Sequence, residues 1–296
     1  EECLDKLREL IALLPKRSHD VPAADTPAAA DAEKLYDLID AQGRKEYDMH
    51  RVIDVLVDRD SWQPFKPDYG QTLICGFCRI GGQPAGIVAN QRMRVQSKTE
   101  GIQIGGVIYP DSADKAARFV MDCNQMRVPI VFLQDVMGFM VGKEAEHGGI
   151  IRSGAKLVNA VSNCIVPKIT VVVGGSFGAG NYAMCGKAYD PTFIFAWPNA
   201  KYAVMGAAQA SGVIFDITKR ALQRDGKEFD EAELHELREQ IHANYEEKTD
   251  IRYGAARGWI DAIIAPEDTR AVVMRALQLA GRERPTGRFH TGVLQV

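Results

Sequence analysis

The residues that most clearly suggest a chemical function are the glycines of residues 174–180, which follow a short β-branched run. Residues 168–173 are typical of a fully buried strand, and residues 181–186 can begin a helix. A strand, a glycine turn and a helix in this order direct unpaired backbone N–H groups to one point. Such a point binds an anion, or the negative oxygen of an enolate or tetrahedral intermediate. We therefore expect an oxyanion hole whose donors are the amides of Ala179 and Gly180.

Other functions of this glycine turn are less favoured by its sequence. It lacks the Gly-Lys-Ser/Thr ending of a P-loop and the spacing of a dinucleotide loop. Ser176 is a conceivable nucleophile, but its neighbours do not form a G-x-S-x-G elbow. A purely structural alternative stays open, in which the glycines only allow a helix to pack closely on the sheet.

Few other side chains suggest chemistry. His147 is a conceivable general base, although an exposed loop histidine is the favoured interpretation. Gln134 and Asp135, at a predicted strand end, could orient a ligand, although Asp135 is as easily a helix cap or a turn acid. Cys75 and Cys78 match C-x-x-C but lie in a predicted strand, which indicates two core thiols in place of a redox or zinc site. No pattern of histidines, cysteines and acidic residues predicts a metal.

The predicted elements place the glycine turn in an α/β fold. A unit of helix, strand and glycine turn occurs twice, which predicts a mainly parallel sheet with helices outside. The two turns then lie at the carboxyl ends of adjacent strands, where sites of α/β proteins usually lie. The first unit comprises residues 113–125, 128–135 and 138–142, and the second residues 150–162, 166–173 and 174–180.

The remaining pattern predicts an N-terminal helix over residues 2–14, a linker over 16–32, and a hairpin of residues 73–80 and 84–90 around two glycines. Residues 90–110 are expected to be irregular. Further helices are expected at residues 33–39, 49–57, 207–224, 230–248 and 269–279, short strands at 193–197 and 202–205, and a strand or turn at 258–264.

Composition narrows the class of protein. The 296 residues carry a formal net charge of −3, which gives no basic footprint for nucleic acid. No apolar run reaches the length of about 20 residues that spans a bilayer. The first residues do not resemble a secretory signal. The chain does not begin with methionine, which suggests a fragment or a processed product.

Several motifs resemble the carboxyltransferase (β) subunits of biotin-dependent acyl-CoA carboxylases, with the methylcrotonoyl-CoA carboxylase β type as the nearest. The strongest is residues 174–186, followed by Ala-Trp-Pro-Asn-Ala at 196–200 and Val-Met-Gly at 204–206. Residues 134–142, 148–156 and 166–170 add to it. The resemblance runs from about residue 45 to the C-terminus.

The resemblance implies a crotonase (ClpP-like) fold, built of ββα turns in a spiral. Residues 33–296 would be the C-terminal carboxyltransferase domain, and residues 1–32 a helix and interdomain linker. The family's oxyanion pair maps onto Ala179 and Gly180, which would hold the ureido oxygen of carboxybiotin. Gly138, Phe139, Phe177, Gly178 and Tyr182 would surround the biotin and substrate.

The implied reaction moves CO₂ from carboxybiotin to an acyl-CoA. After CO₂ is released, the biotin anion would remove the substrate's α- or γ-proton, which explains why no protein base is evident. No metal is implied. The chain has no Ala-Met-Lys-Met biotinylation site and no ATP-binding module. Biotin is therefore expected on a separate carrier protein, with a CoA thioester as the substrate.

The implied partners are a biotin carboxylase and biotin carrier subunit, an N-terminal carboxyltransferase domain, and further copies in a hexamer-type homo-oligomer. The implied location is the cytoplasm, or the mitochondrial matrix in a eukaryote. Residues 94–109 also resemble the α subunit of glutaconyl-CoA decarboxylase, a biotin- and sodium-dependent relative that runs the reverse transfer. A third alternative is a crotonase-fold domain kept only for oligomer assembly.

Overall fold

A computed structural model describes residues 1–13, 26–38, 45–97, 101–224 and 231–281. Its centre is an eight-stranded sheet in the order β1-β2-β3-β7-β9-β10-β12, with β11 paired to β9. β1 to β3 are antiparallel, whereas β3, β7, β9, β10 and β12 run parallel. The predicted mainly parallel sheet is confirmed. The strands are β1 (Gln63–Pro64), β2 (Leu73–Ile80), β3 (Gln83–Asn90), β7 (Ile130–Val136), β9 (Lys168–Phe177), β10 (Phe193–Ala196), β11 (Lys201–Ala203) and β12 (Ala262–Ile263).

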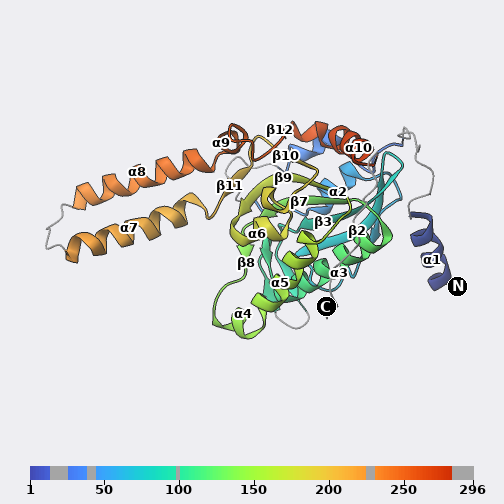
Figure 1. Ribbon diagram of the computed structural model, residues 1–296, viewed down its shortest axis with the longest axis horizontal. Helices are drawn as coiled ribbons and strands as arrows, with labels where there is room; N and C mark the ends of the chain where they lie inside the picture. The colour runs from blue at the N-terminus through green and yellow to red at the C-terminus, as the bar shows by residue number, and fades with distance from the viewer. Residues whose placement is uncertain (14–25, 39–44, 98–100, 225–230, 282–296) are drawn as a thin grey trace.

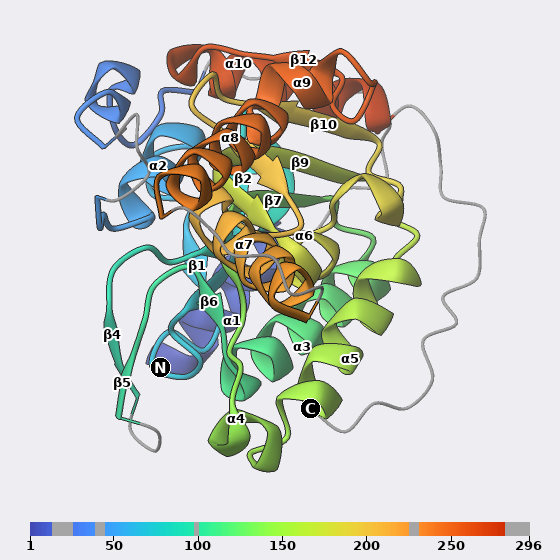
Figure 2. The same cartoon turned by 90° about the vertical axis from the view of Figure 1, so that its left-hand side faces the viewer.

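Helices cover both faces of this sheet (Figure 2). α2 (His50–Leu56) and α10 (Thr269–Ala280) cover one face, and α3 (Pro110–Met126) and α5 (Ile150–Ser162) cover the other. Side chains of a strand alternate between faces, so Val131 and Leu133 enter the core beneath α2 and α10, while Ile130 and Phe132 enter the core beneath α3 and α5. Burial on both faces explains why these strands are continuous apolar runs.

Two small two-stranded sheets lie outside the main sheet. β6 (Val107–Ile108) pairs in parallel with β8 (Gly138–Phe139), and β4 (Val95–Ser97) pairs with β5 (Gly101–Gln103) in a hairpin. Residues 90–110, expected to be irregular, therefore contain three short strands. The predicted helix over residues 33–39 was also wrong in part, because only η1 (Ala32–Leu35) is helical and the turn that follows is described to residue 38.

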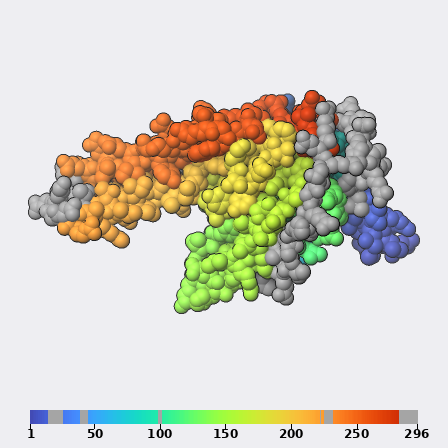
Figure 3. Space-filling model, viewed as in Figure 1, coloured from blue at the N-terminus to red at the C-terminus, as the bar shows by residue number. Residues whose placement is uncertain are grey.

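A helical arm extends from the body of the molecule (Figures 1 and 3). It consists of α7 (Ala207–Arg224) and α8 (Glu231–Thr249), close to the two helices expected there. Among the described residues no helix is long and apolar enough to cross a membrane. The remaining elements are α1 (Glu2–Leu13), α4 (Lys143–His147), α6 (Gly178–Ala183), η2 (Lys187–Tyr189), α9 (Ile251–Ala255) and η3 (Pro266–Asp268).

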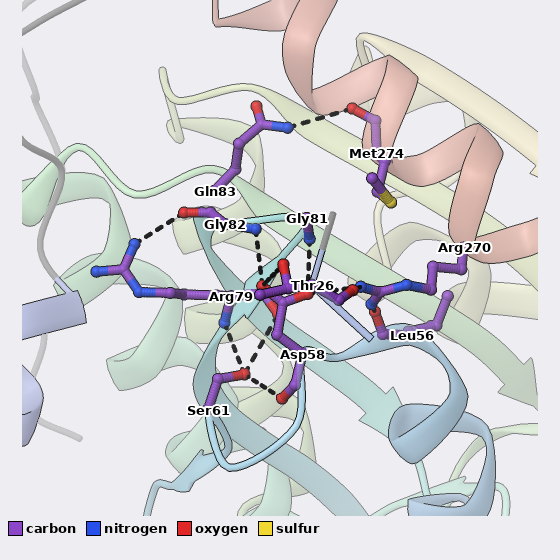
Figure 4. A network of polar contacts seen from close by, with 10 residues as sticks. All are labelled: Thr26, Leu56, Asp58, Ser61, Arg79, Gly81, Gly82, Gln83, Arg270 and Met274. Carbon is purple, nitrogen blue, oxygen red and sulfur yellow. Dashed lines mark hydrogen bonds and ion pairs between the residues drawn. The ribbon is translucent and has the colours of Figure 1, made fainter. Parts of the chain in front are cut away.

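The buried carboxylate of Asp58 ties the hairpin of β2 and β3 to the last helix (Figure 4). It accepts hydrogen bonds from the backbone N–H groups of Gly81 and Gly82, each at 2.7 Å. Arg270 of α10 forms an ion pair with it at 2.6 Å, and the Thr26 hydroxyl donates to it at 3.1 Å. The predicted hairpin is thus held at its turn by an acid 20 residues or more away in the sequence.

The glycine segment after residue 173 differs from its prediction. β9 continues through Gly174 and Gly175 to Phe177, and the register with β7 shifts there, from Gln134 opposite Val172 to Val136 opposite Ser176. This is a β-bulge in place of a turn. The bulge needs glycine, because a β-carbon on Gly174 would lie 2.4 Å from the Asp135 carboxyl carbon.

Candidate active site

The strand β9 passes directly into α6 at the boundary between Phe177 and Gly178. Gly178 has φ +55°, a left-handed conformation that glycine adopts readily. Ala179 and Gly180 then form the first turn of α6, where backbone N–H groups have no carbonyl one turn earlier to bond. The described residues supply no other acceptor for these two amides, and Phe177 provides no side-chain cap. The two predicted donors are therefore open, on a helix that begins three residues earlier than expected.

The first turn of α6 lies against the end of β7. A β-carbon on Gly180 would lie 2.5 Å from Cγ2 of Val136 and 3.1 Å from Cα of Gly138. The two glycine segments that the sequence placed at neighbouring strand ends are therefore in contact. Ala179 is exposed beside this contact, whereas Gly180 is buried.

The other predicted pocket residues are not all at this junction. The ring of Phe139 packs on α5, since a β-carbon on Gly154 would lie 2.9 Å from it. Tyr182 is exposed on the surface of α6, with its ring 5.6 Å from that of Tyr189. Phe177 is half-buried and lines a cavity on the other side of the strand end.

This cavity, of about 520 Å³, lies at the carboxyl ends of β7 and β9 and at the base of the α7–α8 arm. Of the predicted site residues it contains only Phe177. Lys201 and His242 on its wall both face Glu246, at 2.5 Å and 3.7 Å. The pKa of Glu246 is lowered by the hydrogen bond from Lys201. This cluster was not predicted, because Lys201 comes from β11 and the other two residues come from α8.

Asp135 forms the polar floor of the cavity. Its carboxylate accepts hydrogen bonds from the Tyr47 hydroxyl and the Gly175 amide, each at 2.8 Å, and pairs with Arg92 at 3.1 Å. Burial and the adjacent Asp135 charge raise the pKa of Tyr47 well above its usual value. Asp135 therefore stabilises the bulge of β9 from within β7, where it is not a turn residue, and a role in orienting a ligand stays a prediction.

The alternative reactive residues are not placed for chemistry. Ser176 is fully buried and donates its hydroxyl proton to Gln134, so no substrate reaches it. His147 is exposed at the end of α4, as the favoured interpretation required. Cys75 and Cys78 are buried free thiols in opposite cores, and burial raises the pKa of Cys75 to about 12. Within the described ranges no group of three or more metal-binding side chains gathers.

Comparison with known proteins identifies the family to which this chain belongs. A family model described as the carboxyl transferase domain matches residues 1–290. The probable mitochondrial methylcrotonoyl-CoA carboxylase beta chain of Drosophila melanogaster is 42% identical over 90% of this chain and 45% of its own length. The biotin-dependent 3-methylcrotonyl-coenzyme A carboxylase beta1 subunit of Mycobacterium tuberculosis is 43% identical over 88% of this chain and 46% of its own length.

Solved structures show the same similarity. The transcarboxylase 12S hexamer with hydrolysed methylmalonyl-coenzyme A bound superposes with a TM-score of 0.81 at 34% identity, over 97% of this chain and 53% of that one. The geranyl-CoA carboxylase beta subunit of P. aeruginosa has a TM-score of 0.75 at 34% identity, over 97% of this chain and 52% of that one. The chain thus spans about half the length of the relatives it matches.

Proposed function

This chain belongs to the carboxyl transferase family, and we propose that it acts as the biotin-facing domain of an acyl-CoA carboxyltransferase. Its fold is the crotonase-like α/β fold expected from the sequence. The chain spans about half the length of its relatives, so the proposed activity is that of a longer protein that includes this domain. In that arrangement residues 33–296 form the domain, residues 1–32 precede it as helix and linker, and a partner carboxyltransferase domain supplies the rest of the site.

One observation carries the mechanism. The amides of Ala179 and Gly180 are open at the first turn of α6, and the Ala179 end is exposed. Two N–H groups aimed at one point stabilise an oxygen that becomes negative during reaction, and removal of one such donor costs about 10²–10³ in rate. The open amides fit the ureido oxygen of biotin, which gains negative charge when its carboxyl group leaves.

Carboxybiotin, when bound, would supply both the CO₂ and the base that removes the substrate proton. The chain's own contribution would be to hold and polarise one oxygen. The open amides provide this, and the lack of a side chain at Gly180 allows α6 to approach the end of β7. No general base from the protein is needed. This role agrees with the burial of Ser176 and with the position of His147 outside the junction.

The partners and substrate follow from the relatives by analogy. Relatives described as beta chains of biotin-dependent carboxylases suggest a biotin carboxylase and a biotin carrier as partners and a CoA thioester as substrate. A solved relative is described as a hexamer, which supports a homo-oligomer of that type. These relatives also favour carboxylation over the glutaconyl-CoA decarboxylase reaction, and location in the cytoplasm or mitochondrial matrix stays a prediction.

Transfer to acyl-CoA provides the test. The full-length protein would be incubated with a carrier that bears ¹⁴C-carboxybiotin and with a panel of acyl-CoA thioesters that includes 3-methylcrotonoyl-CoA and propionyl-CoA. We expect acid-stable label in at least one CoA product. Label that leaves the carrier without any acyl-CoA product would contradict the proposal. Transfer only from a carboxylated acyl-CoA to the carrier would indicate the decarboxylase direction.

A further inference from the structure

Three buried polar side chains connect β7, β9 and α6. The hydroxyl of Ser176 donates to Oε1 of Gln134 at 2.6 Å, and Nδ2 of Asn181 donates to the Ser176 hydroxyl oxygen at 2.7 Å. The exposed fractions of the three residues are 0%, 0% and 6%. No substrate touches groups this deeply buried. Their function, if any, must act through the elements that they join.

The chain of bonds has one direction from end to end. The Tyr202 hydroxyl donates to Oδ1 of Asn181 at 3.3 Å, and Nε2 of Gln134 donates to the carbonyl of Met184 at 2.6 Å. Each side-chain amide therefore accepts at its oxygen and donates at its nitrogen. Reversal of one amide would break two bonds. Bonds arranged head to tail also polarise one another, which strengthens each link.

These hydrogen bonds hold the middle of α6, at Asn181, and its C-terminal end, at Met184. Asn181 follows Gly180 directly, and Met184 is the residue that caps the helix at its C-terminus. A helix of six residues is far too short to be stable alone, so its direction depends on tertiary contacts. Phe177 gives no side-chain cap at the N-terminus. The internal contacts of Asn181 and Gln134 are therefore the polar contacts that fix the axis of α6 on the sheet.

We propose that Gln134, Ser176 and Asn181 are positioning residues that aim the amides of Ala179 and Gly180 at the reacting oxygen. The inference rests on the proposed function, in which those amides stabilise negative charge. Donors in such a site must be held within about 0.5 Å of their productive positions. A displacement of about 1 Å can cost about 10²-fold in rate. Loss of one link allows α6 to tilt while the sheet stays intact.

A matched control lies on the same strand. The Thr170 hydroxyl, also fully buried on β9, donates to the carbonyl of Cys185 at 2.7 Å, beyond the end of α6. Ser176→Ala and Thr170→Val each delete one buried hydroxyl donor from β9. Only the first deletion releases the helix that bears the open amides. Loss of stability is expected in both variants, so stability alone does not separate the two roles.

The test uses the full-length protein with its carrier and compares kcat, KM for acyl-CoA and thermal unfolding. We expect Ser176→Ala to lower kcat about tenfold or more with KM for acyl-CoA unchanged, and Thr170→Val to leave kcat within about threefold. Asn181→Asp, which keeps the side-chain size but cannot donate to Ser176, should lower kcat in the same way. Equal kcat in the Ser176 and Thr170 variants would overturn the inference.

A double-variant cycle separates this inference from the proposed function. Ala179→Pro deletes one of the amides on which Ser176 is argued to act. If the network acts through that amide, Ser176→Ala should lower kcat much less in the Ala179→Pro background than in the parent protein. Full additivity would overturn the positioning role alone. No effect of Ala179→Pro on kcat would instead contradict the proposed oxyanion hole.

Discussion

Gly180 lies so close to Gly138 that a β-carbon at position 180 would be 3.1 Å from Cα of residue 138. The two residues belong to the two repeated units, Gly138 in β8 just after the end of β7 and Gly180 in the first turn of α6. Their contact brings the open amide of Ala179 to the carboxyl edge of the sheet. The absence of a side chain at Gly180 is therefore a requirement of the packing between α6 and the end of β7.

Ala179→Pro should remove one donor of the proposed oxyanion hole and little else. Proline fits the first turn of a helix, where the lost N–H has no intrahelical partner. It disfavours a helical residue before it, and Gly178, with φ +55°, is outside that region. We expect a fall of about 10²–10³ in kcat with an unchanged melting temperature. Ala179→Ser, which keeps the N–H, should stay within a few-fold of the parent rate, and a similar loss in both variants would contradict the donor role.

Gly180 is less suitable for a proline substitution that tests the donor role, but it is well suited to a test of the packing between α6 and β7. Gly180→Pro would require Ala179, a helical residue, to precede proline, and any β-carbon would overlap Val136. We expect Gly180→Ala to lower the free energy of unfolding by about 1–3 kcal/mol through overpacking. Chemical denaturation would measure this. Val136→Ala in the same chain should recover part of the loss, because it removes the overlapping methyl groups.

The control for this packing prediction is Gly212→Ala on α7. A β-carbon there meets nothing within 4 Å, and alanine is favoured over glycine inside a helix. We expect no loss of stability from that change. If Gly180→Ala unfolds at the same denaturant concentration as the parent, the close contact between α6 and β7 is wrong.

Much of this arrangement was predictable from local sequence patterns. The α5 helix has the predicted bounds, and the hairpin of β2 and β3 matches its prediction to within a residue, because apolar periodicity and paired glycines are local signals. The role of Ala179 and Gly180 as oxyanion donors stays a prediction. The bulge at Gly174 was not predicted, because it depends on Asp135 from another strand, and glycines that accommodate a neighbouring side chain look like a turn in the sequence.

The surroundings of the site were less predictable for a similar reason. Phe139 packs on α5 and Tyr182 is exposed, and their predicted role as walls of the substrate pocket stays a prediction. The direction of a side chain after a strand end depends on which helix lies beside it. The cluster of Lys201, His242 and Glu246 depends on where the arm returns to the body, and no local pattern encodes that contact.

Stability should decrease at high pH through Tyr47. Its pKa is raised well above the usual value of about 10, first by burial and then by Asp135. Above pH about 10 the unfolded chain releases this proton while the folded chain retains it, so the unfolded state binds fewer protons and stability falls as pH rises. Tyr47→Phe should abolish this share of the loss. Melting temperatures from pH 7 to about 11 would check it, and parallel curves for both proteins would contradict the prediction.

Asp58→Ala should destabilise the fold without a direct effect on chemistry. The change leaves the partly buried Arg270 side chain without its ion pair and the amides of Gly81 and Gly82 without their acceptor. Removal of one partner of a buried ion pair costs about 3–5 kcal/mol. The hairpin turn precedes β3, which runs parallel to β7, so this network lies at the edge of the sheet opposite the carboxyl ends. Denaturant unfolding should therefore shift strongly, while kcat per folded molecule at low temperature stays unchanged.

The exposed ion pair of Asp5 and Arg8 is the control for this loss. It joins two neighbouring turns of α1 at 2.7 Å, with both side chains more than half exposed. Exposed pairs contribute about 0–1 kcal/mol, so Asp5→Ala should barely shift the unfolding midpoint. A comparable shift in both variants would mean that burial of Asp58 is not the source of its effect. A fall in kcat of folded Asp58→Ala protein would show that the hairpin end of the sheet is coupled to the carboxyl end through the strands that run between them.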